Sequence, residues 1–286
     1  MSHTVTAGLD GSRESHAALD WAAAEAVRRS ATLEIVQVHE TGAYPYSQLI
    51  DDQVEIDHAE RMVKEAAAEI DRRHPGLHLT SQVVAGRPAA VLDEIASRSD
   101  LLVLGTRGFG GLRGFFVGSA ALPAVAHARC PVVLVRAGGG DPDRKGDIVV
   151  GAKPDGTPPA LLDFAFDEAA LRSVPLRVLH ALDLPPGHRR GRRRAAPPPD
   201  AELVEQQTAR LRGQVEPWRE RHPDVEVECR TVEGPPAVHL VEEAADAALL
   251  VVGRRPHHHR VGTHIGPVTH AVMHHALVPV VVVPHD

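Results

Sequence analysis

The sequence predicts an α/β protein made of two tandem copies of one domain, each with a helix-covered parallel sheet. Three observations predict this fold class. Short apolar runs alternate with helical stretches, which is the pattern of parallel strands joined by crossover helices. The second half repeats residues of the first half at a nearly constant spacing. The chain has 286 residues, enough for two domains of ordinary size.

The repeat can be read directly from the chain. Three stretches recur 148 residues later: Gly86-Arg87-Pro88-Ala89 as Gly234-Pro235-Pro236-Ala237, Asp100-Leu101-Leu102-Val103 as Ala248-Leu249-Leu250-Val251, and Cys130-Pro131-Val132-Val133 as Val278-Pro279-Val280-Val281. Nearer the start of each half the spacing is 143 residues, as between Asp20 and Asp163. A repeat of this length indicates a duplicated domain, because solenoid units are only about 20–50 residues long.

The first half is expected to alternate strands with helices. The expected strands are 4–9, 33–39, 79–84, 101–104 and 131–135, and the expected helices are 14–29, 54–73, 88–98 and 119–128. The first helix is alanine-rich with apolar residues at helical spacing. The strand at 101–104 is continuously apolar, as in strands that are covered on both faces.

The second half repeats this pattern. Strands are expected at 147–152, 176–182, 225–231, 248–252 and 279–283, and helices at 159–172, about 201–221, 236–245 and 267–276. The stretch between the halves is rich in glycine and charge. The sequence therefore predicts an N-terminal domain at 1–137, a linker at 138–146 and a C-terminal domain at 147–286.

Composition excludes several classes of protein. The formal net charge of −7 argues against a nucleic-acid binder, which needs a basic face. The two cysteines, Cys130 and Cys229, lie at non-equivalent places in the repeat, so neither a disulfide framework nor a paired-thiol metal site is expected. The first residues predict no signal peptide, and no apolar stretch approaches the ~20 residues of a membrane span. A cytoplasmic protein that binds neither membrane nor nucleic acid is expected.

A spaced glycine motif follows the fourth strand of the first half. Residues 101–119 read LLVLGTRGFGGLRGFFVGS, in which Gly105, Gly108 and Gly118-Ser119 lead from a strand to a helix start. Bare backbone N–H groups and a helix N-terminus in such a loop favour a phosphate. The second copy has Pro256 and Pro267 in the places of Gly108 and Ser119. Since proline lacks the N–H group, the second site is expected to be degenerate.

These motifs resemble the universal stress protein family. The resemblance is carried by Gly105-x2-Gly108-x9-Gly118-Ser119, by the segment AGLDGS at 7–12 and by Cys130-Pro131-Val132-Val133. It covers both halves, and the two-copy arrangement is similar to tandem members found in actinobacteria. The resemblance implies two doubly wound domains, each with a five-stranded parallel sheet in the order 3-2-1-4-5. It also implies a cytoplasmic stress-response regulator that acts as a sensor or adaptor.

The resemblance further implies that ATP, with or without Mg²⁺, binds at the carboxyl ends of strands 1 and 4 of the N-terminal domain. The implied site residues are Gly8, Asp10, Gly11, Val38 through its backbone, Gly105, Arg107, Gly108, Gly118, Ser119 and Ala120. The residues alone leave a second interpretation of Asp10 open, as a turn residue before Gly11. Lys153 or Pro154 occupies the place of Asp10 in the second half, so no nucleotide is expected there. Arg254, Arg255 and Arg260 could still attract another anion.

No enzyme is expected beyond slow, incidental ATP hydrolysis. The sequence has neither a G-x-x-x-x-G-K-[ST] loop nor a nucleophile elbow. Two alternatives remain open: a nucleotide-free dimeric scaffold, and a nucleotidyl-transferring enzyme that releases pyrophosphate. A protein partner of unknown identity is expected, together with an internal pseudo-dimer that pairs strands 131–135 and 279–283. A homodimer is a further option.

Two polar segments fit no part of this pattern. The loop at 184–200 concentrates arginine and proline, which favours an extended solvated loop over a docking segment for an acidic or phosphorylated partner. The histidines 257–259, with His264, His270, His274 and His275 nearby, invite a zinc, copper or nickel site. Adjacent histidines rarely point at one centre, and no acidic or cysteine ligand is near in sequence. No metal is therefore expected.

Overall fold

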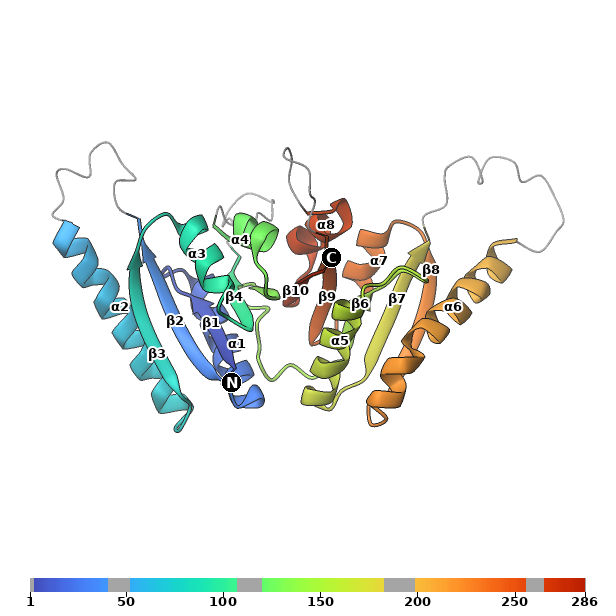
Figure 1. Ribbon diagram of the computed structural model, residues 1–286, viewed down its shortest axis with the longest axis horizontal. Coiled ribbons are helices and arrows are strands. Elements are labelled where there is room, and N and C mark those ends of the chain that lie inside the picture. Colours follow the sequence, from blue (N-terminus) through green and yellow to red (C-terminus); the bar gives the residue numbers. More distant parts are fainter. Residues whose placement is uncertain (1–2, 41–51, 107–119, 183–198, 256–264, 286) are drawn as a thin grey trace. The chain divides into compact units, whose positions relative to one another are not determined.

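The computed structural model describes residues 3–40, 52–106, 120–182, 199–255 and 265–285. The chain divides into two compact units, one built mainly from the N-terminal half and one mainly from the C-terminal half. Each unit is an α/β domain with a parallel sheet, as the sequence predicts (Figure 1).

In the N-terminal half the strands pair in the order β3-β2-β1-β4-β5, all parallel. The elements are β1 (Thr4–Gly8), α1 (Arg13–Arg29), β2 (Thr32–His39), α2 (Asp52–Arg73), β3 (Leu79–Ala85), α3 (Pro88–Ala96), β4 (Leu101–Gly105), α4 (Ala121–His127) and β5 (Val132–Val135). The chain moves from β1 outward to β3 and then from β4 outward to β5 in the opposite direction. Right-handed crossovers therefore place α1 and α2 on one face of the sheet and α3 and α4 on the other.

The C-terminal half has the same topology, with the strand order β8-β7-β6-β9-β10. Its elements are β6 (Ile148–Gly151), α5 (Pro159–Arg172), β7 (Leu176–Leu182), α6 (Pro199–Arg221), β8 (Val227–Glu233), α7 (Pro236–Glu243), β9 (Leu249–Arg254), α8 (Pro267–His275) and β10 (Val280–Pro284). The strand predicted at 225–231 begins two residues later, because Val225 still closes a turn through its N–H to the carbonyl of His222 (3.1 Å).

The sequence repeat reproduces local chemistry as well as topology. Helices α1 and α5 both end at a serine in the left-handed conformation, Ser30 with φ 50° and Ser173 with φ 53°. The paired aspartates Asp20 and Asp163 each bind an arginine of the following helix, Arg73 in α2 and Arg221 in α6. These matched contacts fix the second helix of each half against the first.

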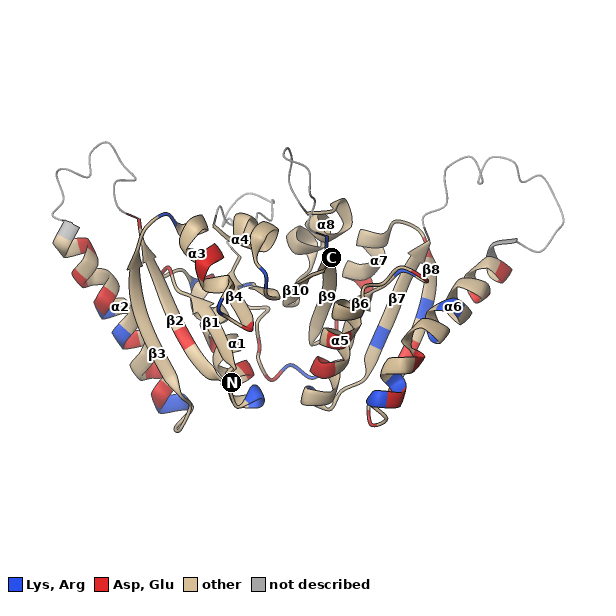
Figure 2. Cartoon of the chain, in the orientation of Figure 1, with Lys and Arg blue, Asp and Glu red and all other residues tan. Residues whose placement is uncertain are grey.

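One strand position carries opposite charges in the two halves. Glu34 on β2 is only 6% exposed and accepts hydrogen bonds from Thr6 (3.1 Å), Gln82 (2.7 Å) and Arg98 (3.0 Å). Its counterpart on β7 is Arg177, which pairs with Asp147 (2.5 Å) and Glu243 (3.3 Å). Figure 2 shows this difference as a red segment in β2 and a blue segment in β7. Each half therefore pairs the charge at this position with its own partners.

Replacing Glu34 by alanine is expected to reduce the free energy of unfolding by about 2–3 kcal/mol, since Gln82 and Arg98 lose a shared buried acceptor. Urea unfolding followed by circular dichroism measures the change. Glu94→Ala is the matched control, because Glu94 lies exposed on α3 and its substitution is expected to change the free energy by no more than about 0.5 kcal/mol. Equal effects of the two substitutions would contradict the structural role of Glu34.

Candidate functional site

The strand order of the N-terminal half reverses between β1 and β4. The chain leaves β1 toward β2 on one side and leaves β4 toward β5 on the other. In open α/β sheets this reversal leaves a crevice at the carboxyl ends of the two strands, where ligands bind. The residues that follow β1 and β4 therefore form the candidate site.

Asp10 lies in the turn between β1 and α1. Its Oδ1 accepts hydrogen bonds from the backbone N–H (2.9 Å) and the hydroxyl (2.5 Å) of Ser12, and its own N–H donates to Ser15 Oγ (3.3 Å). Ser12 is in turn the N-cap of α1. Asp10 therefore acts as a turn residue, which is the alternative that the sequence left open. The Asp10 side chain is also exposed, so the same turn holds a carboxylate at the crevice.

Gly11 is favoured by this turn. Its φ of +77° lies in the left-handed region, and a Cβ there would lie 3.1 Å from the Met62 side chain of α2. A side chain at this position would strain the backbone and require the end of the Met62 side chain to shift.

Gly8 and Gly105 are explained by packing between neighbouring elements. A Cβ on Gly105 would lie 2.5 Å from the carbonyl carbon of Glu14 and 2.6 Å from the nitrogen of Ser15, in the first turn of α1. A Cβ on Gly8 would lie 2.7 Å from Leu104 on β4. Close approach of α1 to β4 therefore accounts for Gly105 without any ligand.

The backbone of Val38 is placed by the alternation of strand hydrogen bonds. The carbonyl of Val36 accepts from Leu9 beside β1 (2.8 Å), and the carbonyl of His39 accepts from Gly86 beside β3 (2.9 Å). Because the direction of the carbonyl groups alternates along β2, the Val38 carbonyl points to the β1 side. Val38 lies two residues beyond Val36, which pairs with Gly8, the last residue of β1. This backbone group therefore lies at the carboxyl end of the sheet, beside β1.

The predicted phosphate residues are only partly described. Arg107, Gly108, Gly118 and Ser119 lie outside the described residues. Ala120 is described: it is half-buried and immediately precedes α4, with no side-chain cap. The structure therefore brings Gly8, Asp10, Gly11, Val38 and Gly105 to one end of the sheet.

Two polar side chains on β2 were not predicted to belong to the site. Gln37 Oε1 and His39 Nε2 are both buried and have no hydrogen-bond partner in the structure, which describes 3–40 and 52–106 in this half. Two polar residues at alternate positions near the end of β2 are the signal that could have identified them.

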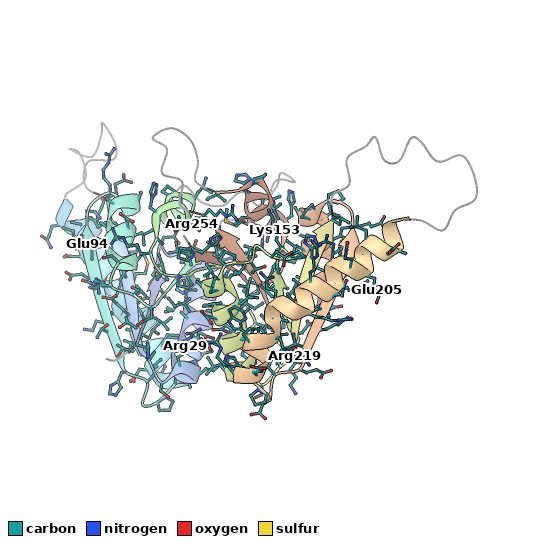
Figure 3. The ribbon with its side chains drawn as sticks, turned by 45° about the vertical axis from the view of Figure 1, so that its right-hand side comes forward. Arg29, Glu94, Lys153, Glu205, Arg219 and Arg254 are labelled. Atoms are coloured by element: carbon teal, nitrogen blue, oxygen red, sulfur yellow. The ribbon has the colours of Figure 1, made fainter. Side chains whose placement is uncertain are left out.

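The equivalent turn of the C-terminal half is built differently. Lys153 occupies the place of Asp10, and its N–H and carbonyl both bond the Thr157 hydroxyl at 2.8 Å. Asp155 has φ 57° and lies 3.6 Å from Arg210 of α6. In Figure 3 Lys153 and Arg254 both lie toward the end of the sheet at which β6 and β9 finish. The turn thus carries a cation where the first half has a carboxylate.

Two further differences lie at the predicted second site. Pro267 begins α8 directly after the N-cap Gly266, so the predicted proline at a first helical position is confirmed. Arg254 is 5% exposed at the end of β9, and burial lowers the pKa of its guanidinium. Pro256 and Arg260 lie outside the described residues, whereas Arg255 is exposed.

The described residues offer little support for a metal site or a reactive thiol. No group of three or more histidine, cysteine, aspartate or glutamate side chains that could hold a metal occurs there. The rings of His270 and His274 lie 4.4 Å apart on α8, whereas 257–259 and 184–198 fall outside the description.

Burial raises the pKa of the Cys130 thiol to about 12 and that of Cys229 to about 11, so both stay protonated at neutral pH. None of the described helices is long and apolar enough to cross a membrane.

Sequence comparison gives one consistent result. The profile of the Universal stress protein family matches residues 1–136 and 146–284. A universal stress protein of Mycobacterium tuberculosis strain H37Rv is 32% identical over 317 aligned residues, covering 99% of this chain and 96% of that protein. Another from the same strain is 34% identical over 302 residues, covering 98% of this chain and 96% of the relative.

Comparison with solved structures shows the fold. A universal stress protein from Archaeoglobus fulgidus DSM 4304 is similar with a TM-score of 0.79 and 16% identity, and the match covers 100% of both chains. A functionally unknown protein from Pseudomonas aeruginosa PAO1 has a TM-score of 0.66 and 16% identity, and the match covers 100% of this chain and 93% of that one.

Proposed function

Because the chain belongs to the universal stress protein family, we propose that it is a stress-response regulator that binds ATP in its N-terminal half. The observation that carries the proposal is the Asp10 carboxylate, held at the reversal of strand order by its bonds to Ser12. The C-terminal half has Lys153 at this place. The two halves therefore offer opposite charges to a ligand.

The proposed contacts follow from the chemistry of the nucleotide. Asp10 accepts hydrogen bonds from the ribose hydroxyls, and the Val38 carbonyl accepts one from the adenine amine. Arg107, Gly108, Gly118 and Ser119 hold the phosphates, with or without Mg²⁺, through backbone N–H groups, a hydroxyl and positive charge. No nucleotide is proposed for the C-terminal half.

ATP acts in this proposal as a signal rather than as a substrate. Occupancy shifts the protein between conformations that differ in affinity for a protein partner, which makes the chain a sensor or adaptor. Any hydrolysis is slow and incidental. A pyrophosphate-release assay separates this proposal from a nucleotidyl-transferring enzyme, because only the enzyme releases pyrophosphate.

A nucleotide-free scaffold is the second candidate. Packing against neighbouring elements is enough to explain Gly8 and Gly105, so these two glycines are not evidence for a ligand. This favours the scaffold. The proposal also places the protein in the cytoplasm and includes an internal pseudo-dimer through strands 131–135 and 279–283. That pairing stays a prediction.

Grafting the residues of the second half into the first tests the proposal against the scaffold. Gly108→Pro reproduces Pro256, and Ser119→Pro reproduces Pro267. Each change removes a backbone donor, so each is expected to weaken ATP binding at least about tenfold in calorimetry. Circular dichroism melting of both variants is the control, since the natural sequence already carries these prolines in its second half. Native ATP affinity in folded variants would favour the scaffold.

A further inference from the structure

We propose that Gln37 and His39 contact the nucleobase directly and make the site prefer a 6-amino purine over a 6-oxo purine. This inference rests on the proposed nucleotide site and deepens it, because it names residues that distinguish one base from another. Both residues belong to β2 and both flank Val38.

Gln37 and His39 each carry a buried polar atom that is unpaired. The structure gives neither Gln37 Oε1 nor His39 Nε2 a hydrogen-bond partner within its described ranges. His39 is only 7% exposed, and Gln37 is half-buried with its Oε1 atom itself buried, so bulk water does not reach either atom. Nearly all buried polar side-chain atoms in proteins are hydrogen-bonded, and leaving one unpaired is costly. A ligand that supplies the missing partners removes that cost.

Gln37 and His39 lie on the same face of the sheet as the Asp10 turn. Side chains alternate along a strand, so Gln37 and His39 lie on one face and Glu34 lies on the other. Glu34 bonds Arg98, which follows α3, so its face is the one that α3 covers. Gln37 and His39 therefore lie on the face of α1, which the Asp10 turn enters.

The residues at the equivalent positions of the second half differ from Gln37 and His39. The residue equivalent to Gln37 is His180, whose Nδ1 bonds the carbonyl of Ala152 at 3.1 Å. The residue equivalent to His39 is Leu182, which has no polar side-chain atom. The half that lacks the Asp10 carboxylate thus also lacks the two unpaired atoms. The unpaired atoms occur together with the carboxylate.

The ligand chemistry follows from the type of atom. In the orientation that the structure gives the Gln37 amide, the unpaired Oε1 is an acceptor, and the partner that fits it is a donor such as the 6-amino group of adenine. Inosine triphosphate differs from ATP in having an oxygen at this place, and that oxygen would leave Oε1 facing a second acceptor. His39 Nε2 pairs with a ring nitrogen of the base.

Calorimetric titration of the full chain with ATP and with inosine triphosphate tests the proposal. The parent is expected to bind ATP about tenfold or more tightly than inosine triphosphate. Gln37→Leu is expected to reduce this preference at least about threefold, and the Val38 carbonyl, which also accepts from the 6-amino group, retains the rest. His39→Leu, which introduces the residue of the second half, is expected to weaken both. Gln206→Leu is the control, because Gln206 is exposed on α6 and its substitution should change neither affinity.

Thermal stability provides a readout that a structural role would not give. Removing an unpaired buried polar atom should raise the melting temperature of the free protein by about 2–4 °C in Gln37→Leu and His39→Leu. A fall in melting temperature, or an unchanged preference for ATP, would overturn the assignment of the two residues. A parent that binds neither triphosphate would instead overturn the proposed function itself.

Discussion

Replacing Gly105 by alanine is expected to lower the free energy of unfolding by about 3 kcal/mol. The added Cβ would lie 2.5 Å from the carbonyl carbon of Glu14 and 2.6 Å from the nitrogen of Ser15. These are backbone atoms in the first turn of α1, so no side chain can rotate away. Either the helix or β4 must move, and both are part of the core of the N-terminal half. Urea unfolding followed by circular dichroism measures the loss.

Gly213→Ala is the matched control for this substitution. Gly213 lies inside α6, and a Cβ there would meet nothing within 4 Å. Since alanine favours helix over glycine, this variant is expected to gain about 0.5–1 kcal/mol. The same chemical change should therefore have opposite signs at the two positions. A Gly105→Ala variant as stable as the parent would show that α1 does not approach β4 as the structure has it.

Asp10→Ala is expected to reduce the affinity for ATP by about 10- to 100-fold, because hydrogen bonds to a charged group contribute about 1.5–3 kcal/mol. The same change removes the bonds to Ser12 and should lower the free energy of unfolding by about 1 kcal/mol. Calorimetry measures the affinity, and chemical unfolding measures the stability.

Two variants separate the ligand role of Asp10 from its role in the turn. Asp10→Asn keeps an oxygen that can accept from Ser12 but loses the charge, so stability should be retained while affinity falls. Lys153→Ala makes the corresponding change in the C-terminal half and is expected to leave ATP binding unchanged. An Asp10→Ala variant with native affinity would restrict Asp10 to the turn.

Much of the fold could be predicted from the sequence because apolar periodicity reports directly on burial. The continuous apolar run at Leu101–Leu104 predicted a strand covered on both faces, and all four residues are buried in β4. The strand order was predicted through the resemblance to a family and is confirmed. Boundaries were less accurate at β8, where a turn at Val225 delays the strand.

The chemistry of polar residues inside strands could not be predicted in the same way. Glu34, Gln37 and His39 all follow apolar neighbours in β2, and periodicity does not say which of them has a partner. Glu34 is fully bonded, whereas Gln37 and His39 each have a buried unpaired atom. Partners come from elements distant in sequence, such as Arg98 beyond α3. Only the folded arrangement distinguishes a structural carboxylate from a candidate ligand contact.

Isothermal titration of ATP into the full chain shows whether one of the two homologous halves binds a nucleotide. We expect saturable binding with one ATP per chain, and loss of that binding in Gly108→Pro. Absence of heat at millimolar ATP, or saturation at two ATP per chain, would contradict it.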